Sequence, residues 1–161
     1  MARIGILTGG GDCPGLNAVI RGIVRQGIGE YGHEFIGLRH GWAGILGGET
    51  VELGPESIAG LLPRGGTILG SSRTNPYREG GGGTAAVTEG LEALRLEAII
   101  AIGGEDTLGV ATKLAADDVP VIGVPKTIDN DICFTERTFG FETAVAMSRQ
   151  PLGSAHMARD P

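Results

Sequence analysis

Three short, uniformly apolar runs constrain the fold of this chain more than any other feature. They are Arg3–Thr8, Glu97–Ile102 and Val119–Val124. Strands without polar alternation are covered on both faces, as in the parallel sheets of α/β proteins. Segments with helical periodicity separate the runs, so the order of elements predicts an α/β fold: a doubly wound, mostly parallel sheet flanked by helices.

The remaining elements are predicted from local patterns. We expect helices over Gly15–Tyr31, Pro55–Leu62, Thr84–Leu94 and Thr107–Ala116, and further strands over Glu34–Leu38 and Gly66–Gly70. Thr84 is a candidate N-cap, and the glycine-rich segment Arg78–Thr84 is expected to be a flexible surface loop.

Composition excludes several classes of protein. The net charge is −6 and no run of Lys or Arg occurs, which disfavours a nucleic-acid partner. Cys13 and Cys133 are the two cysteines and show no CxxC spacing, so we expect a reduced, cytoplasmic chain. With no leader pattern and no apolar run of about 18 residues, secretion and a membrane location are disfavoured as well.

Glycine-rich or acid-rich segments follow each of the three apolar runs. These segments are Gly9–Asp12, Gly103–Thr107 and Pro125–Asp131. Doubly wound sheets bind ligands at the carboxyl ends of their strands. The sequence therefore predicts that the three segments lie together around one ligand.

Each segment has a chemical interpretation and a purely structural one. The first glycine run can present N–H groups to an anion, or can be a tight turn. Glu105 and Asp106 can hold a Mg²⁺ ion that bridges phosphates, or can be an acidic helix start. In the third segment a carboxylate can accept a hydroxyl proton, or the segment can be an Asx-rich turn that ends the strand.

Four segments taken together resemble one family. Thr8–Asn17 (TGGGDCPGLN), Gly65–Arg73 (GGTILGSSR), Gly103–Thr107 and Pro125–Asp131 are similar, in order and in approximate spacing, to successive motifs of the phosphofructokinases. The resemblance covers residues 2–147. It implies phosphoryl transfer from a donor to the 1-hydroxyl of fructose 6-phosphate, a step of glycolysis, with Mg²⁺ as cofactor.

The resemblance also implies a role for individual residues. Arg73, Thr127 and Asp129 would be catalytic, Arg73 on the transferring phosphoryl group and Asp129 as general base. Thr127, Asp129 and Asp131 would bind the sugar phosphate, and Glu105 and Asp131 the metal. Contacts with the donor phosphates are expected from Gly11, Gly104, Asp106, Thr107 and Lys126.

Asp106 indicates which donor is used. ATP-using members of the family resemble this sequence but carry glycine there, which leaves room for the α-phosphate of the nucleotide. A carboxylate in that space would repel the α-phosphate, an effect worth about 100-fold in donor preference. We therefore expect the pyrophosphate-dependent type. Lys126 could also neutralise pyrophosphate, but it does not discriminate, because ATP-using relatives can carry it as well.

The resemblance also predicts the organisation of the chain. Residues 1–147 would form the donor-binding domain, and the second, sugar-phosphate-binding half of the family is absent. Residues 148–161 would be a tail outside the family, from a frameshift or a cloning vector, in which Pro151 and Gly153 interrupt the helix. We expect the chain to be inactive alone, and the full-length protein to be a homodimer or homotetramer.

Other interpretations stay open from the sequence. The nearest is an ATP-dependent 6-phosphofructokinase, and a lipid or NAD kinase is more distant, because Pro125–Asp131 argues against it. From another class, the protein could be a regulatory subunit that binds phosphate without turnover. Arg21 and Arg25 match effector-site positions of allosteric relatives, or are two solvated helix arginines.

Overall fold

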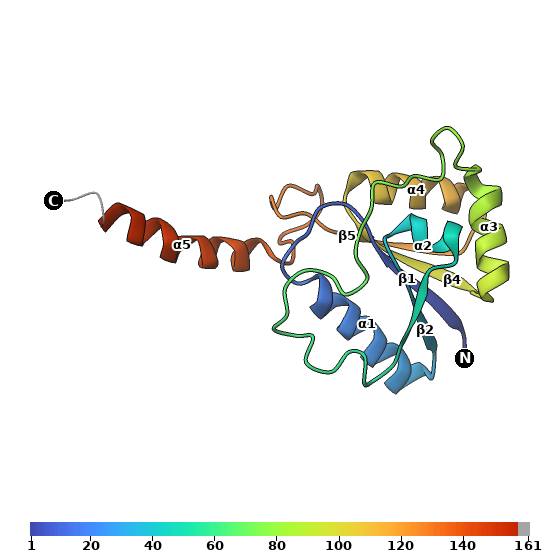
Figure 1. Cartoon of the computed structure of the whole chain (residues 1–161), viewed down its shortest axis with the longest axis horizontal. Helices are drawn as coiled ribbons and strands as arrows, with labels where there is room; N and C mark the ends of the chain where they lie inside the picture. Colours follow the sequence, from blue (N-terminus) through green and yellow to red (C-terminus); the bar gives the residue numbers. More distant parts are fainter. Residues whose placement is uncertain (158–161) are drawn as a thin grey trace.

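Five strands form one sheet in the order β3-β2-β1-β4-β5 in the computed structural model (Figure 1), which describes residues 1–157. The strands are β1 (Arg3–Thr8), β2 (Glu34–Leu38), β3 (Thr50–Leu53), β4 (Ala98–Gly103) and β5 (Val121–Pro125). The helices are α1 (Leu16–Tyr31), α2 (Trp42–Gly47), α3 (Gly83–Leu94), α4 (Glu105–Ala116) and α5 (Phe141–Met157).

All strand pairs are parallel except β2 with β3. β1 lies at the centre, where Ile6 is in register with Gly37 of β2 and with Ile100 of β4. Helical crossovers connect the parallel strands in sequence, as parallel pairing requires. The predicted fold class, a mostly parallel sheet flanked by helices, is confirmed.

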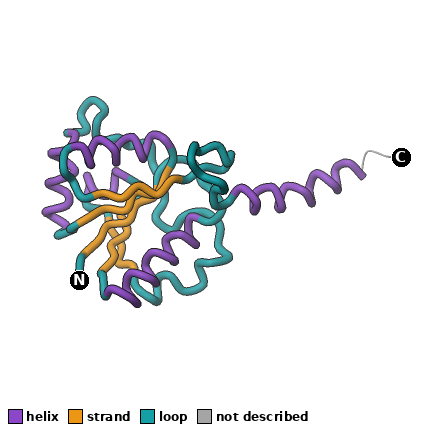
Figure 2. Tube along the Cα trace, turned by 180° about the vertical axis from the view of Figure 1, so that it is seen from behind, coloured by secondary structure: helices purple, strands orange, loops and turns teal. Residues whose placement is uncertain are grey.

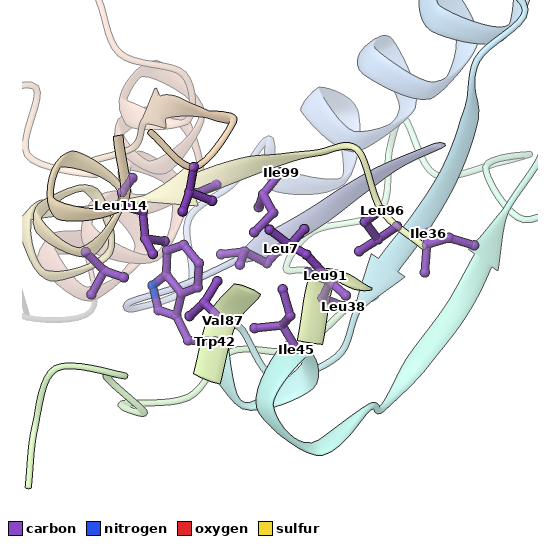
Figure 3. Packing of buried hydrophobic residues seen from close by; sticks show 14 residues of the cluster. Leu7, Ile36, Leu38, Trp42, Ile45, Val87, Leu91, Leu96, Ile99 and Leu114 are labelled. Carbon is purple, nitrogen blue, oxygen red and sulfur yellow. The ribbon is translucent and has the colours of Figure 1, made fainter. Parts of the chain in front are cut away.

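Both faces of the central strand are buried from Gly5 onward, which explains why neighbouring residues such as Ile6 and Leu7 are both apolar. Leu7 packs into a cluster with residues of α2, α3 and α4, among them Trp42, Val87 and Leu114 (Figure 3). Ile6, one residue earlier, points to the opposite face and joins a second cluster, which contains Ile20 of α1. Successive side chains of a strand alternate between faces, so two neighbouring apolar residues contribute to two different clusters.

Two of the predicted elements are wrong. Pro55–Leu62 is a series of turns rather than a helix, because Gly60 takes a left-handed φ of 71° that a helix cannot accommodate. Gly66–Gly70 is a loop rather than a strand, because Gly66 and Gly70 have φ of 72° and 69°. Within this loop the Ile68 N–H donates to Asn17 Oδ1 at 2.8 Å and not to a neighbouring strand.

The N-cap predicted at Thr84 is also wrong. α3 begins at Gly83, and Gly82 is its cap residue. The Thr84 hydroxyl instead bonds to the Tyr77 hydroxyl, 2.7 Å away, and to the Asp117 carboxylate. A short polar side chain that finds tertiary partners is not available to cap its own helix.

The predicted interruption of the last helix is wrong too. α5 continues through Pro151 and Gly153 to Met157. α5 projects away from the sheet on the side where most loops gather (Figure 2). Residues 158–161 of the predicted tail lie outside the described residues. No helix in the described part of the chain is long and apolar enough to cross a membrane.

Candidate active site

The first two glycine segments meet at the point where the strand order reverses. β1 and β4 are parallel neighbours in the sheet. From β1 the chain continues through α1 toward one edge of the sheet, to β2, and from β4 it continues through α4 toward the opposite edge, to β5. The loops after β1 and β4 therefore diverge and leave a crevice between them, where open α/β sheets bind ligands. The N–H of Gly9 donates to the carbonyl of Ile102 at 2.9 Å and fixes the first loop to β4.

Thr107 fills the space under these two loops. Its side chain is only 4% exposed. A Cβ atom on Gly9 would overlap Thr107 Oγ1, and one on Gly103 would lie 2.5 Å from Thr107 Cβ. Glycine is thus needed at both strand ends so that the first turn of α4 can approach β1 closely.

Lys126 supports the first glycine loop from below. Its side chain is buried, and Nζ donates to the carbonyl oxygen of Gly11 at 2.5 Å. Nζ also lies 3.4 Å from the position of a Cβ on Gly10, whose φ is 79°. The ammonium group therefore holds the loop in shape and adds a positive charge beside its N–H groups.

A pocket of about 600 Å³ opens beside these loops. Its wall contains four residues that the sequence assigned to the donor or to catalysis: Gly11, Arg73, Asp106 and Thr107. The other residues of the wall are Gly10, Trp42, Ser71, Ser72, Thr74, Asn75 and Arg78. Gly104 is absent from the wall but is the cap residue of α4, next to the Gly10 loop.

Arg73 and Arg78 bring two positive charges to a pocket whose wall has one carboxylate, that of Asp106. Their loop is anchored at its start, where Ser72 Oγ donates to the carbonyl of His40 at 2.6 Å. It is anchored again at Tyr77, whose hydroxyl bonds to Thr84. Two arginines and a glycine loop in one pocket wall make a site suited to a small, highly charged phosphate.

Sequence reasoning missed Arg78 and Trp42. The four consecutive glycines shortly after Arg78 predict a flexible surface loop, and that prediction gave Arg78 no role in the site. Trp42 belongs to a helix that was not predicted at all. Its ring is 3% exposed, and its Nε1–H has no hydrogen-bond partner among the described residues.

The third segment forms a tight turn after β5. Thr127 Oγ1 donates to Asp131 Oδ1 at 2.7 Å and accepts the N–H of Asp129 at 3.1 Å. The structure thus brings these three residues together, with all of them at least partly open to solvent. They are not part of the wall of the donor pocket, and their roles in catalysis and in sugar binding stay predictions.

The acidic residues are compatible with Mg²⁺ but do not form a closed cage. Glu105 and Asp106 lie in the first turn of α4, and Asp131 is bonded to Thr127. Within the described residues no three His, Cys, Asp or Glu side chains gather as a metal site. Mg²⁺ is commonly held by one or two carboxylates together with substrate phosphates, and the exposed acids beside the pocket fit that arrangement.

The two cysteines should differ strongly in reactivity. Cys13 is 1% exposed and donates to the Phe139 carbonyl at 3.3 Å, whereas Cys133 is exposed. Burial raises the pKa of the Cys13 thiol above its usual value, against the opposing charge of Lys126. A raised pKa means less thiolate at a given pH, and thiolate is the reactive form.

We therefore expect iodoacetamide at pH 8 to alkylate Cys133 at least about 10-fold faster than Cys13. Peptide mass spectrometry after timed quenching measures both rates in one sample. The Cys133→Ser variant should show almost no early labelling. Equal rates at the two positions would contradict the buried placement of Cys13.

The fold and the pocket define a doubly wound α/β domain with a glycine- and arginine-lined pocket at the carboxyl ends of its strands. Comparison with known proteins gives the family. The family model for Phosphofructokinase matches residues 3–157, and the chain belongs to the phosphofructokinase family. The matched range extends beyond residue 147, and the origin of residues 148–161 stays a prediction.

The chain is similar both to relatives named for pyrophosphate as donor and to relatives named as ATP-dependent. It is 57% identical over 155 residues to a pyrophosphate–fructose 6-phosphate 1-phosphotransferase of Streptomyces coelicolor, covering 96% of this chain and 45% of the relative. It is 51% identical over 150 residues to ATP-dependent 6-phosphofructokinase 3 of the same organism, covering 93% and 44%. The chain thus spans about 45% of the length of these curated relatives.

A solved structure supports the same assignment. Phosphofructokinase from Pichia pastoris in the T-state superposes with a TM-score of 0.76 at 30% identity, over 86% of this chain and 16% of that one. The sheet and its flanking helices are therefore arranged as in this solved phosphofructokinase.

Proposed function

We propose that the full-length protein transfers a phosphoryl group from pyrophosphate to the 1-hydroxyl of fructose 6-phosphate, which gives fructose 1,6-bisphosphate and orthophosphate. The observation that carries this proposal is the Asp106 carboxylate in the wall of the pocket, among the glycine loop and Arg73. The names of several similar relatives support the same donor and acceptor.

Each part of the pocket has a defined task in this reaction. Gly10, Gly11 and the start of α4 offer N–H groups to the donor phosphates, with the Lys126 ammonium behind the loop. Arg73 stabilises the charge on the transferring group. Asp129 accepts the proton of the sugar hydroxyl. Because phosphoryl transfer has a loose transition state, positioning and charge neutralisation supply most of the catalysis.

Mg²⁺ would complete the site. Glu105 and Asp131 are the carboxylates that would hold the ion. It would supply positive charge to neutralise the phosphate groups. We further propose a cytoplasmic enzyme that forms a homodimer or homotetramer. The 161-residue chain, with under half the length of its relatives, is expected to show no turnover alone.

Pyrophosphate is the donor that the charges of the pocket favour. In the proposed arrangement the two phosphates of pyrophosphate contact the glycine loop and the two arginines, which line the same pocket as Asp106. A nucleotide has a third phosphate, which would have to lie beside the carboxylate. Unfavourable contact between like charges is worth about 100-fold in relative affinity.

An ATP-dependent 6-phosphofructokinase is the second candidate. It is favoured by the 51% identity to an ATP-dependent relative, only slightly below the 57% to a pyrophosphate-dependent one. Overall identity therefore does not decide between the donors, and the decision depends on position 106.

Substitution of Asp106 tests the proposed donor. In the full-length enzyme we expect kcat/KM for pyrophosphate to exceed that for ATP by about 100-fold or more. Asp106→Gly should reduce this ratio by at least about 10-fold through improved use of ATP. Asp106→Asn keeps the bulk of the side chain and removes its charge, so it should improve the use of ATP by less than Asp106→Gly does.

Steady-state kinetics with each donor, at fixed Mg²⁺ and fructose 6-phosphate, measures the ratios. Asp118→Asn is a matched control, because Asp118 is exposed and belongs to the turn after α4 rather than to the pocket. A wild-type preference for ATP, or a ratio that Asp106→Gly does not change, would contradict the proposed role of Asp106.

A further inference from the structure

Asn130 stands between two carboxylates of the turn after β5, Asp129 and Asp131, in a backbone conformation that few residues adopt. Its φ is 56°, in the left-handed region. Among residues with a side chain, Asn is one of the few that occupies this region readily. The direction in which the Asp129 side chain points depends on this backbone conformation.

The side chain of Asn130 holds a residue eight positions later. Its Oδ1 accepts the N–H of Thr138 at 2.9 Å and bonds to the Thr138 hydroxyl at 3.2 Å. Thr138 is 9% exposed, so both of its donor groups are largely shielded from water. One amide oxygen therefore closes residues 130–138 into a loop.

The far end of this loop is fixed to the first glycine segment. Gly140 has φ 96°, and a Cβ atom there would overlap the Pro14 carbonyl and lie 2.5 Å from Cys13 Sγ. Phe139 accepts a bond from Cys13 Sγ at 3.3 Å. Thr138 is thus attached to the segment that joins β1 to α1, and Asn130 attaches the turn to Thr138.

The Asp129 carboxylate has no hydrogen bond of its own among the described residues. Its backbone N–H is bonded to Thr127 on one side, and Asn130 follows it on the other. The orientation of the carboxylate is therefore set by the backbone of the turn and by the contacts that hold this turn in place.

We propose that Asn130 is a positioning residue, which fixes the direction of the Asp129 carboxylate by linking the turn to Thr138. This inference rests on the proposed role of Asp129 as general base. A general base must lie within hydrogen-bond reach of the proton that it accepts, and a displacement of about 1 Å can cost about 100-fold in rate.

Asn130→Gly in the full-length enzyme is the informative substitution, because glycine accepts the positive φ but cannot bond to Thr138. We expect kcat to fall by about 10-fold or more, while KM for the donor changes by less than about 3-fold. Thr138→Val, which keeps the backbone N–H, should have a smaller effect. In an Asn130→Gly background it should add nothing further.

A second cycle separates positioning from a merely structural role. In an Asp129→Asn background, Asn130→Gly should lower the residual kcat by less than about 2-fold, since there is no base left to misplace. Equal losses in both backgrounds would overturn the inference, and so would an Asn130→Gly enzyme with unchanged kcat. If Asp129→Asn itself leaves kcat intact, the proposed general base fails first, and the inference fails with it.

Discussion

Replacement of Asp129 by Asn should lower kcat of the full-length enzyme by about 10²- to 10⁴-fold, the usual contribution of a general base. The amide has nearly the same shape as the carboxylate and cannot accept the proton of the sugar hydroxyl. The hydrogen bond that the backbone N–H of Asp129 donates to Thr127 Oγ1 does not involve the carboxylate, so the substitution keeps it. KM for the donor should therefore change little, because Asp129 is not part of the wall of the donor pocket.

Glu136→Gln is the matched control for this substitution. Glu136 is exposed, lies in the same loop and loses the same charge. Its kcat should stay within about 2-fold of the wild type, as is usual for surface positions. Coupled assays of fructose 1,6-bisphosphate formation measure both variants. A decrease of less than about 10-fold in Asp129→Asn would remove Asp129 from its proposed role.

Arg73→Lys should lower kcat by about 10²- to 10³-fold, the range seen when one donor to developing charge is lost. Lysine keeps the positive charge but not the planar pair of N–H groups that can bridge two oxygens. The loop around Arg73 should stay in place, because its anchor is the bond from Ser72 Oγ to the His40 carbonyl.

Arg64→Lys provides the comparison for Arg73, since Arg64 is exposed and outside the pocket. Its kinetics should match the wild type. If Arg73→Lys raised KM for pyrophosphate with kcat unchanged, Arg73 would bind the ground state and the transition state equally. That result would contradict its assignment to the transferring group.

The sequence predicted the central strands well because their environment is simple. A strand buried on both faces is largely apolar, and β1 and β4 were found within about one residue of their ends. β5 was found within about two residues of its predicted ends, but the prediction that it is buried on both faces is wrong, because β5 is the edge strand of this sheet and Ile122 is 61% exposed. α2 and β3 were missed because they are short. In α2, Gly44 approaches the backbone of Arg39 so closely that no Cβ would fit, a tertiary requirement that local propensity does not reveal.

The candidate site was predictable where it depends on strand ends. Glycines and acids after β1 and β4 meet because parallel strands end at the same edge of the sheet. Arg78 was not predicted, because its position depends on the path of an irregular loop held by Tyr77, Thr84 and Asp117. The tertiary bond between Asn130 and Thr138 was likewise not predicted, because no helical or strand periodicity governs such pairs.

A single competition experiment tests the central claim most directly. The full-length enzyme is given equal concentrations of pyrophosphate and ATP, with Mg²⁺ and fructose 6-phosphate in one tube, and ³¹P NMR follows both donors. We predict that pyrophosphate is consumed and orthophosphate accumulates, while ATP stays intact. Formation of ADP at the expense of ATP, with pyrophosphate unchanged, would contradict the proposal that Asp106 reserves this pocket for pyrophosphate.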